Sequence, residues 1–142
     1  NKHMELTAGD AKLTIMTSLN QDGGNESSLC VLFQAGSCDI LITGDRTELG
    51  EKLLMKQIAL PKLELLVVGH HGAKDSTCQE LLDAASPQIA VISAGKYNRY
   101  GHPHETVLQR LEDSGAMILR TDEDGTIIFR GTTHGEENGT TE

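Results

Sequence analysis

The architecture of this 142-residue chain can be worked out from residues 65–72, Leu65-Leu66-Val67-Val68-Gly69-His70-His71-Gly72. The apolar run has the length and composition of a strand buried on both faces, which is typical of parallel sheets. The run ends in two histidines and a glycine. Imidazoles at the carboxyl end of a buried strand occupy the usual position of active-site groups in layered α/β proteins.

Two further apolar runs end in polar groups of the same kind. Ile42-Thr43-Gly44-Asp45 lies upstream, and Ser93-Ala94-Gly95 leads downstream into Tyr100-Gly101-His102-Pro103-His104. Ligand-binding groups of open α/β sheets gather at the carboxyl ends of the strands. We therefore expect three strands to bring their polar groups to one edge of a sheet.

The rest of the pattern places strands first and then alternates helices with strands. We expect hairpins around Gly9-Asp10 and around residues 35–37, and a closing hairpin formed by residues 116–119 and 126–129. Apolar residues at helical spacing predict helices from Arg46 to Leu60, after a capping box at Thr77, and up to Gly115. This order predicts a layered α/β fold in which helices cover a mixed sheet.

The length of the chain is sufficient for one domain, which we assign to residues 5–130. We interpret residues 1–4 as a vector remnant and residues 131–142 as a disordered tail. The apolar runs are too short for a membrane span, so we expect no membrane contact by this segment. Three cysteines without C-x-x-C spacing support neither a disulfide framework nor a zinc ribbon.

The formal net charge of −9 argues against a surface that coats nucleic acid, because such a surface needs clustered Lys and Arg. A local site remains compatible with this charge, since a bound cation removes the repulsion between acidic groups and a phosphate. Lys96 and Arg99, beside Tyr97 and Tyr100, form a small patch that suits phosphates and stacked bases.

Asp45 has two interpretations. With Glu48 three positions on, it can cap the helix that begins at Arg46. Its carboxylate can also bind a metal, as a hard oxygen ligand beside imidazole nitrogens. His70 and His71 are likewise either a hydrogen-bonded pair or part of a metal site. Because successive strand side chains point to opposite faces, only one of the two is expected to face the metal.

His102 and His104 flank Pro103 and belong either to a solvated loop or to the substrate side of the site. They lie just before a predicted helix, whose amino-terminal end favours an anion. We therefore assign both histidines to the substrate rather than to the metal. Their expected catalytic role is to protonate a leaving oxygen.

Five motifs together carry a resemblance to a known family. They are Asn25-x-x-Ser28-Leu29, Leu41-Ile42-Thr43-Gly44-Asp45, Val68-Gly69-His70-His71-Gly72, Asn98-Arg99-Tyr100-Gly101-His102-Pro103-His104 and Thr121-Asp122-Glu123-Asp124-Gly125. In these motifs residues 5–130 resemble the metallo-β-lactamase-like domain of the ComEC family of bacterial competence and DNA-internalisation proteins. The resemblance implies an αββα metallohydrolase fold, a zinc or manganese site, and phosphodiester hydrolysis of incoming DNA. It also implies a soluble domain of a cell-membrane protein, with the extracytoplasmic side favoured.

The resemblance also suggests roles for individual residues. By position, Asp45 matches the metal-bridging aspartate of the family, and the His70-His71 pair contains its late histidine ligand. His102 and His104 match the substrate-side motif. The family commonly has a serine where this chain has Ala73, so a hydroxyl contact would have to come from a residue further on. The substrate-binding candidates are Lys96, Asn98, Arg99, Ser76 and Thr77.

One family motif, H-x-H/D-x-D-H, is absent, since the six histidines stand at positions 3, 70, 71, 102, 104 and 134. We therefore expect the carboxyl-terminal half of the fold, an incomplete metal site and no activity by this chain alone. Exposed apolar surface would then offer a route to homodimers. Two alternatives are a metallohydrolase for a small ester or phosphoester, and a non-catalytic binding or assembly half-domain.

Overall fold

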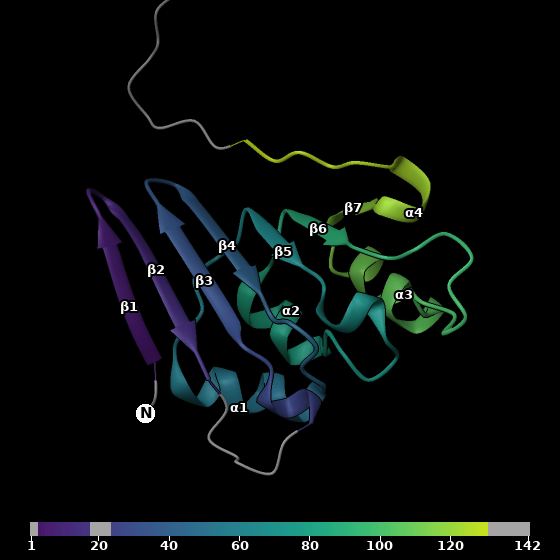
Figure 1. Ribbon diagram of the computed structural model, residues 1–142, viewed down its shortest axis with the longest axis horizontal. Coiled ribbons are helices and arrows are strands. Elements are labelled where there is room, and N and C mark those ends of the chain that lie inside the picture. The colour runs from purple at the N-terminus through teal and green to yellow at the C-terminus, as the bar shows by residue number, and fades with distance from the viewer. Residues whose placement is uncertain (1–2, 18–23, 131–142) are drawn as a thin grey trace, which may run out of the picture.

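The computed structural model describes residues 3–17 and 24–130. Within these ranges one seven-stranded sheet runs through the molecule, and its strand order follows the chain from β1 to β7. The first four strands, β1 (His3–Ala8), β2 (Ala11–Met16), β3 (Cys30–Ala35) and β4 (Cys38–Ile42), pair antiparallel. The last three, β5 (Leu65–Val67), β6 (Ile89–Ile92) and β7 (Met117–Arg120), continue the sheet parallel to β4. The predicted mixed α/β class is confirmed (Figure 1).

Helices connect the parallel strands, because a parallel pair needs a long crossover connection. α1 (Glu48–Gln57) joins β4 to β5, α2 (Gln79–Ala85) joins β5 to β6, and α3 (Glu105–Asp113) joins β6 to β7. They pack against one side of the sheet (Figure 1). A short 3-10 turn, η1 (Asn25–Ser27), precedes β3, and the single turn α4 (Thr121–Asp124) follows β7. Among the described residues, no helix has the length and hydropathy to cross a membrane.

The helix-covered face of the sheet forms the core. Strand register aligns Leu32, Leu41, Leu66 and Ala90 across β3 to β6, and all four side chains are buried. They pack in one cluster with apolar residues of the helices, among them Leu54, Leu81, Leu82, Val107 and Leu111. The alternation of strand side chains therefore places one complete apolar layer under the helices.

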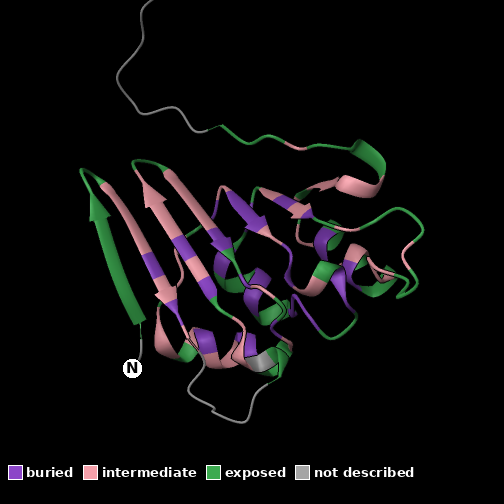
Figure 2. Cartoon of the chain, viewed as in Figure 1, coloured by how far each residue is buried: buried purple, intermediate pink, exposed green. Residues whose placement is uncertain are grey.

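The opposite face of the sheet is also apolar, although it lies away from the three helices. Its side chains align across β2 to β7 and most are only partly buried: Leu13, Ile15, Val31, Phe33, Ile40, Ile42, Leu65, Val67, Ile89, Val91, Met117 and Leu119. Ile42 is 40% exposed and Met117 is 61% exposed. Figure 2 shows β2 and β3 as mixtures of intermediate and buried residues, beside the exposed β1. Parallel strands normally have both faces covered, so this uncovered face is suited to a second layer.

The structure differs from two expectations, and a third concerns residues that it does not describe. The interpretation of residues 1–4 leaves His3 and Met4 out of the fold, but both belong to β1 and pair with Met16 and Ile15. The closing hairpin is wrong, because residues 117–120 pair with the open edge of β6 and residues 126–130 form no strand. The tail of residues 131–142 lies outside the described residues.

The two faces of the sheet predict different costs for neighbouring truncations on β4. Leu41→Ala is expected to lower the free energy of unfolding by about 2–5 kcal/mol, because it leaves a cavity in the core. Ile42→Ala, on the uncovered face, is expected to cost about 1 kcal/mol or less in this chain, since part of its side chain is already in water. Urea denaturation of both variants measures the difference.

Equal losses for the two variants would contradict this assignment. Such a result would mean that the Ile42 face is already packed in solution, for example by a second copy of the chain. Repeating the measurement over a range of protein concentrations tests for a second copy, because dimerisation makes the stability depend on concentration.

Candidate functional site

Main-chain hydrogen bonds join the three predicted segments at one edge of the sheet. The N–H of His70, in the turn after β5, donates to the carbonyl of Gly44 after β4, with an N–O distance of 2.9 Å. The N–H of His104 donates to the carbonyl of Gly72 at 2.8 Å, which brings in the loop after β6. The expected meeting of these strand ends is therefore present.

The His70-His71 pair does not extend strand β5, which corrects the expected alternation. The strand ends at Val67, and Gly69–Gly72 forms a tight turn, η2, in which His70 and His71 have left-handed φ values of 48° and 57°. A residue in that region costs about 1–3 kcal/mol, so the surroundings must enforce the turn. The two imidazoles are thus presented by a turn and not by opposite faces of a strand.

The two glycines of the turn permit close packing on either side of the histidines. A Cβ atom at Gly69 would lie 2.8 Å from the hydroxyl oxygen of Thr43. A Cβ atom at Gly72, where φ is +79°, would lie 2.7 Å from the Cβ of Pro103. Neither site has room for a side chain, which explains the Gly-His-His-Gly pattern in physical terms.

His71 has its ring oriented by a main-chain acceptor. Its Nδ1 lies 2.7 Å from the carbonyl oxygen of Ser93, and a carbonyl only accepts, so Nδ1 carries the proton. The lone pair of a neutral ring is then on Nε2. This is the arrangement that metal-binding histidines usually have, with the second nitrogen donating to a carbonyl or carboxylate. The exposed ring of His71 is therefore prepared to accept a bond from a cation.

His70 has weaker polar contacts. The side-chain nitrogen of Asn25 lies 3.4 Å from its Nδ1 and 3.5 Å from its Nε2, which fixes neither tautomer. Its ring centroid is 5.8 Å from that of His102. The segment that carries Asn25 is anchored by the buried Arg46, whose guanidinium donates to the main-chain carbonyls of Met16, Ser28 and Gly50.

Asp45 lies exposed in the turn after β4. The N-cap of α1 is Thr47 and the first helical residue is Glu48, so the structural interpretation of Asp45 as the helix cap is wrong. Its carboxylate is therefore not committed to the helix. Asp45 directly follows Gly44, whose carbonyl accepts from the His70 amide.

Asp45 and His71 have the donor chemistry of metal ligands, but they do not complete a site. Among the described residues no group of three or more His, Cys, Asp or Glu side chains lies close enough to hold a metal ion. A catalytic zinc site needs about three protein ligands. The described residues therefore do not fit a whole metal centre, and a centre at this edge requires ligands from elsewhere.

Ser76 and Thr77 are both fully buried and brace the histidine turn. The Ser76 hydroxyl donates to the carbonyl of Gly69 at 2.8 Å, and the Thr77 hydroxyl accepts from the N–H of Gly69 at 3.3 Å. The expected capping box at Thr77 is wrong, since α2 begins at Gln79 after Cys78 and has no side-chain cap from these residues. A direct contact of either hydroxyl with a substrate stays a prediction.

A buried carboxylate caps α2 instead. Glu51 of α1 is fully buried and accepts from the main-chain N–H groups of Thr77 at 2.7 Å and Cys78 at 2.8 Å. Burial raises the pKa of the Glu51 carboxyl, while those two amides and the nearby Arg110 oppose the rise. Arg110 of α3 donates from the other side to the carbonyls of Lys74, Ser76 and Thr77.

His104 is the N-cap of α3. Its Nδ1 accepts from the N–H of Thr106 at 3.2 Å. Because an amide N–H only donates, Nδ1 is unprotonated, and in the neutral ring the proton is on Nε2. The Nε2–H of His104 is therefore a hydrogen-bond donor, which suits an anionic group and not a metal.

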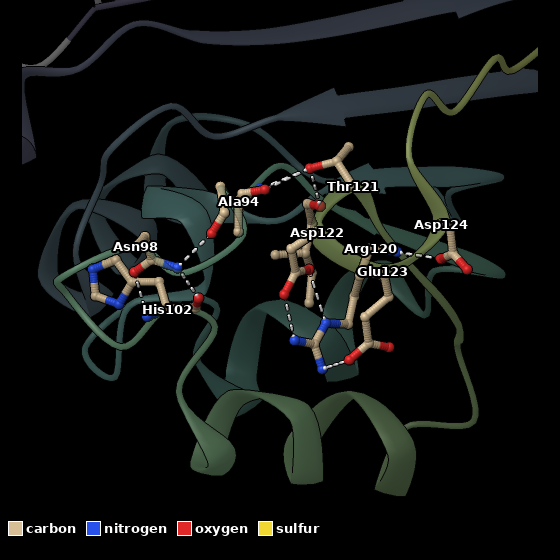
Figure 3. A network of polar contacts seen from close by, with 10 residues as sticks. Ala94, Asn98, His102, Arg120, Thr121, Asp122, Glu123 and Asp124 are labelled. Atoms are coloured by element: carbon tan, nitrogen blue, oxygen red, sulfur yellow. Dashed lines mark hydrogen bonds and ion pairs between the residues drawn. The ribbon is translucent and has the colours of Figure 1, made fainter.

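His102 ends a loop whose main chain is bonded by the side chain of Asn98. The Nδ2 of Asn98 donates to the carbonyls of Gly95 and His102, and its Oδ1 accepts from the N–H of His102 at 3.0 Å (Figure 3). Burial, and then the neighbouring His70 and His71, lower the pKa of His102. A lowered pKa favours the neutral form of the His102 ring, and its role in proton transfer stays a prediction.

The cationic residues of this loop both lie over tyrosines. The Nζ of Lys96 is 5.7 Å from the ring centroid of Tyr97, and the Cζ of Arg99 is 5.0 Å from that of Tyr100. Both rings are exposed. Lys96, Asn98 and Arg99 thus lie on the loop that leads to His102, and substrate contact by any of them stays a prediction.

Replacement of the buried carboxylate tests how the histidine turn is held. Glu51→Gln is expected to lower the free energy of unfolding by about 1–3 kcal/mol, because an amide nitrogen would face a buried main-chain N–H. Glu48→Gln is the matched control on the same helix: Glu48 is exposed and its pair with Lys52 is worth about 1 kcal/mol or less. Equal effects in urea denaturation would show that the Glu51 contacts do not hold the turn.

Sequence comparison finds relatives among bacterial competence proteins. The chain is 44% identical over 106 residues to ComE operon protein 3 of Bacillus subtilis, which covers 75% of this chain and 14% of that protein. It is 39% identical over 109 residues to competence protein ComA of Neisseria gonorrhoeae, covering 76% and 16%. It is 34% identical over 103 residues to recombination protein 2 of Haemophilus influenzae, covering 72% and 13%. The chain thus spans about a seventh of the length of these relatives.

Structural comparison supports the fold class. CmlA, a diiron β-hydroxylase from Streptomyces venezuelae, matches with a TM-score of 0.55 and 14% identity, over 82% of this chain and 31% of that one. No family model matches the sequence. CmlA has the metallo-β-lactamase fold, and at this identity the likeness concerns the fold alone. The chain is therefore a homologue of a short segment of bacterial competence proteins and has a metallo-β-lactamase-type α/β fold.

Proposed function

We propose that this chain is part of a metal-dependent hydrolase domain of the ComEC family and that the complete domain hydrolyses phosphodiesters of DNA. The observation that carries the proposal is the ring of His71, whose Nδ1 donates to Ser93 and whose Nε2 is left to accept a cation. It lies at the same sheet edge as Asp45, which does not cap its helix. The competence relatives favour DNA as the substrate.

In this proposal Asp45 and the His70-His71 pair supply only part of a zinc or manganese site. Of the two histidines, His71 is the better ligand because its ring is oriented by a carbonyl. The remaining ligands belong to a first half of an αββα fold. The uncovered face of the sheet is where such a half would pack, since it is apolar from β2 to β7.

The loop after β6 is assigned to the substrate. His104, with its proton on Nε2, is a donor to a phosphate or leaving oxygen. His102, whose ring centroid is 5.8 Å from that of His70, is assigned to the same substrate side. Lys96 and Arg99 supply positive charge. We assign Asn98 to holding the loop, since its amide already bonds to the main chain at Gly95 and His102. Ser76 and Thr77 act through the turn that they brace.

The setting of the domain follows from the same proposal. We infer a domain outside the lipid bilayer, on the extracytoplasmic side of a bacterial cell-membrane protein, with incoming DNA as its partner. Without the first half, the uncovered face is a surface for homodimers. A different proposal is a non-catalytic binding or assembly half-domain, which the absence of a complete metal cluster among the described residues favours. A metallohydrolase for a small ester or phosphoester is the third.

The chain alone is expected to bind divalent zinc weakly. Asp45 and His71 offer two donors where a tight catalytic site needs about three. Calorimetric titration of the isolated chain should therefore give no tight stoichiometric site, and His71→Ala should weaken the residual binding further. One tight site per monomer would contradict the proposed division of ligands between two halves.

In the complete protein, Asp45→Asn is expected to abolish turnover of DNA while the fold is retained. The amide lacks the charge that a cation requires, yet the stability should change by less than about 0.5 kcal/mol, because the side chain is exposed and caps no helix. Asp10→Asn, in the exposed turn between β1 and β2, is the control and should keep full activity. Unchanged turnover in the Asp45 variant would contradict the assignment of Asp45 as a metal ligand, whereas no turnover by the unaltered complete protein would favour the non-catalytic proposal.

A further inference from the structure

Both tyrosines of the chain lie in one loop at the candidate site. The loop spans residues 95–102, and from residue 93 to residue 104 the sequence contains no Asp or Glu, although the whole chain has a net charge of −9. The same stretch contains Lys96 and Arg99. This loop is therefore a local departure from an acidic protein, and its chemistry combines positive charge with aromatic surface.

The tyrosine rings are not used by the core. Tyr97 is 93% exposed and Tyr100 is 68% exposed. Each has its cation beside it, and the guanidinium of Arg99 also donates to the Tyr100 hydroxyl at 2.9 Å. Much of each ring is thus offered to solvent next to a group that binds phosphate.

The loop is fixed before any ligand arrives. Asn98 bonds to the main chain on both sides, at Gly95 and at His102. The hydroxyl of Thr121, the first residue of α4, bonds to the N–H and the carbonyl of Ala94, at 2.9 Å each (Figure 3). Tyr97 itself has a left-handed φ of 61°. A platform held in this way loses little conformational entropy when a ligand stacks on it.

The rings also connect the loop with the histidine turn. Tyr100 stacks on His102 with centroids 5.9 Å apart and an interplanar angle of 16°. His102 is in turn 5.8 Å from His70. A planar group on Tyr100 is therefore two ring contacts from the candidate metal ligands.

We propose that Tyr97 and Tyr100 form a stacking platform for unpaired nucleobases and that Lys96 and Arg99 bind the adjoining phosphates. The platform selects single-stranded over duplex nucleic acid, because both faces of a base inside a duplex are occupied by its neighbours. This inference rests on the proposed function for its ligand class. It adds the residues that distinguish single-stranded from double-stranded nucleic acid.

The test measures binding of a fluorescent short oligothymidylate by anisotropy, with EDTA present so that no metal takes part. Tyr97→Leu and Tyr100→Leu are each expected to weaken binding by about fivefold or more, because stacking on an aromatic ring is lost. Tyr97→Phe and Tyr100→Phe should bind within about twofold of the parent chain, since a phenyl ring also stacks. Phe129→Leu, an exposed aromatic position outside the loop, is the matched control and should have no effect.

Two ligand controls separate bases from backbone. An oligomer of abasic sites should bind the parent chain as weakly as oligothymidylate binds Tyr100→Leu, and a matched duplex should bind more weakly than the single strand. The proposal is overturned if the leucine variants bind oligothymidylate like the parent chain, if the abasic oligomer binds equally well, or if no oligonucleotide binds. Tyrosine-dependent binding of a proline-rich peptide in place of the oligonucleotide would also overturn it.

The outcome is independent of hydrolysis. Tyrosine-dependent binding in EDTA, together with a complete protein that does not cleave DNA, would leave the platform in place and remove the proposed hydrolase. Cleavage that is indifferent to both leucine substitutions, with unchanged binding, would retain the hydrolase and remove the platform.

Discussion

The candidate site depends on a carboxylate that does not face it. Glu51 accepts from two main-chain amides at the start of α2 and is shielded from water. Charge-assisted hydrogen bonds of this kind contribute about 1.5–3 kcal/mol each. They fix Thr77, whose hydroxyl holds Gly69, and so they help to keep His70 and His71 in a left-handed turn. The hydrogen bonds of Glu51 thus help to offset the backbone strain of the histidine turn.

Much of the fold could be predicted from the sequence because strand and helix periods are local signals. The buried strand that begins at Leu65, the hairpin around residues 35–37 and the helix that ends before Gly115 were all recognisable from apolar spacing. The closing hairpin was not, because Asp122 to Gly125 has turn composition while the open edge of β6 determines the pairing of β7. The pairing of a strand with an open sheet edge is a tertiary effect, so local composition does not reveal it.

The site shows the same division between local and tertiary information. Sequence reasoning found the residues that gather at the sheet edge, because each follows an apolar run. It missed Glu51 and Arg110, since a charged residue on an amphipathic helix has the same spacing whether it faces solvent or a buried loop. The N-cap role of His104 was open to prediction, because it directly precedes the helix that contains Val107 and Leu111. Histidine is not among the favoured cap residues, which hid the signal.

The order of the strands has a consequence for how the molecule assembles. Each strand from β2 to β7 pairs with the strand that precedes it in the chain. The sheet pairings therefore join strands that are consecutive in the chain, and folding is faster when contacts have smaller sequence separations. The polar edge from Asp45 to His104 comes from three successive units, so no distant part of the described chain has to arrive before these units associate. The histidine turn can therefore form as the parallel strands join the antiparallel ones. The uncovered apolar face of the sheet is then complete, and another layer can pack on it.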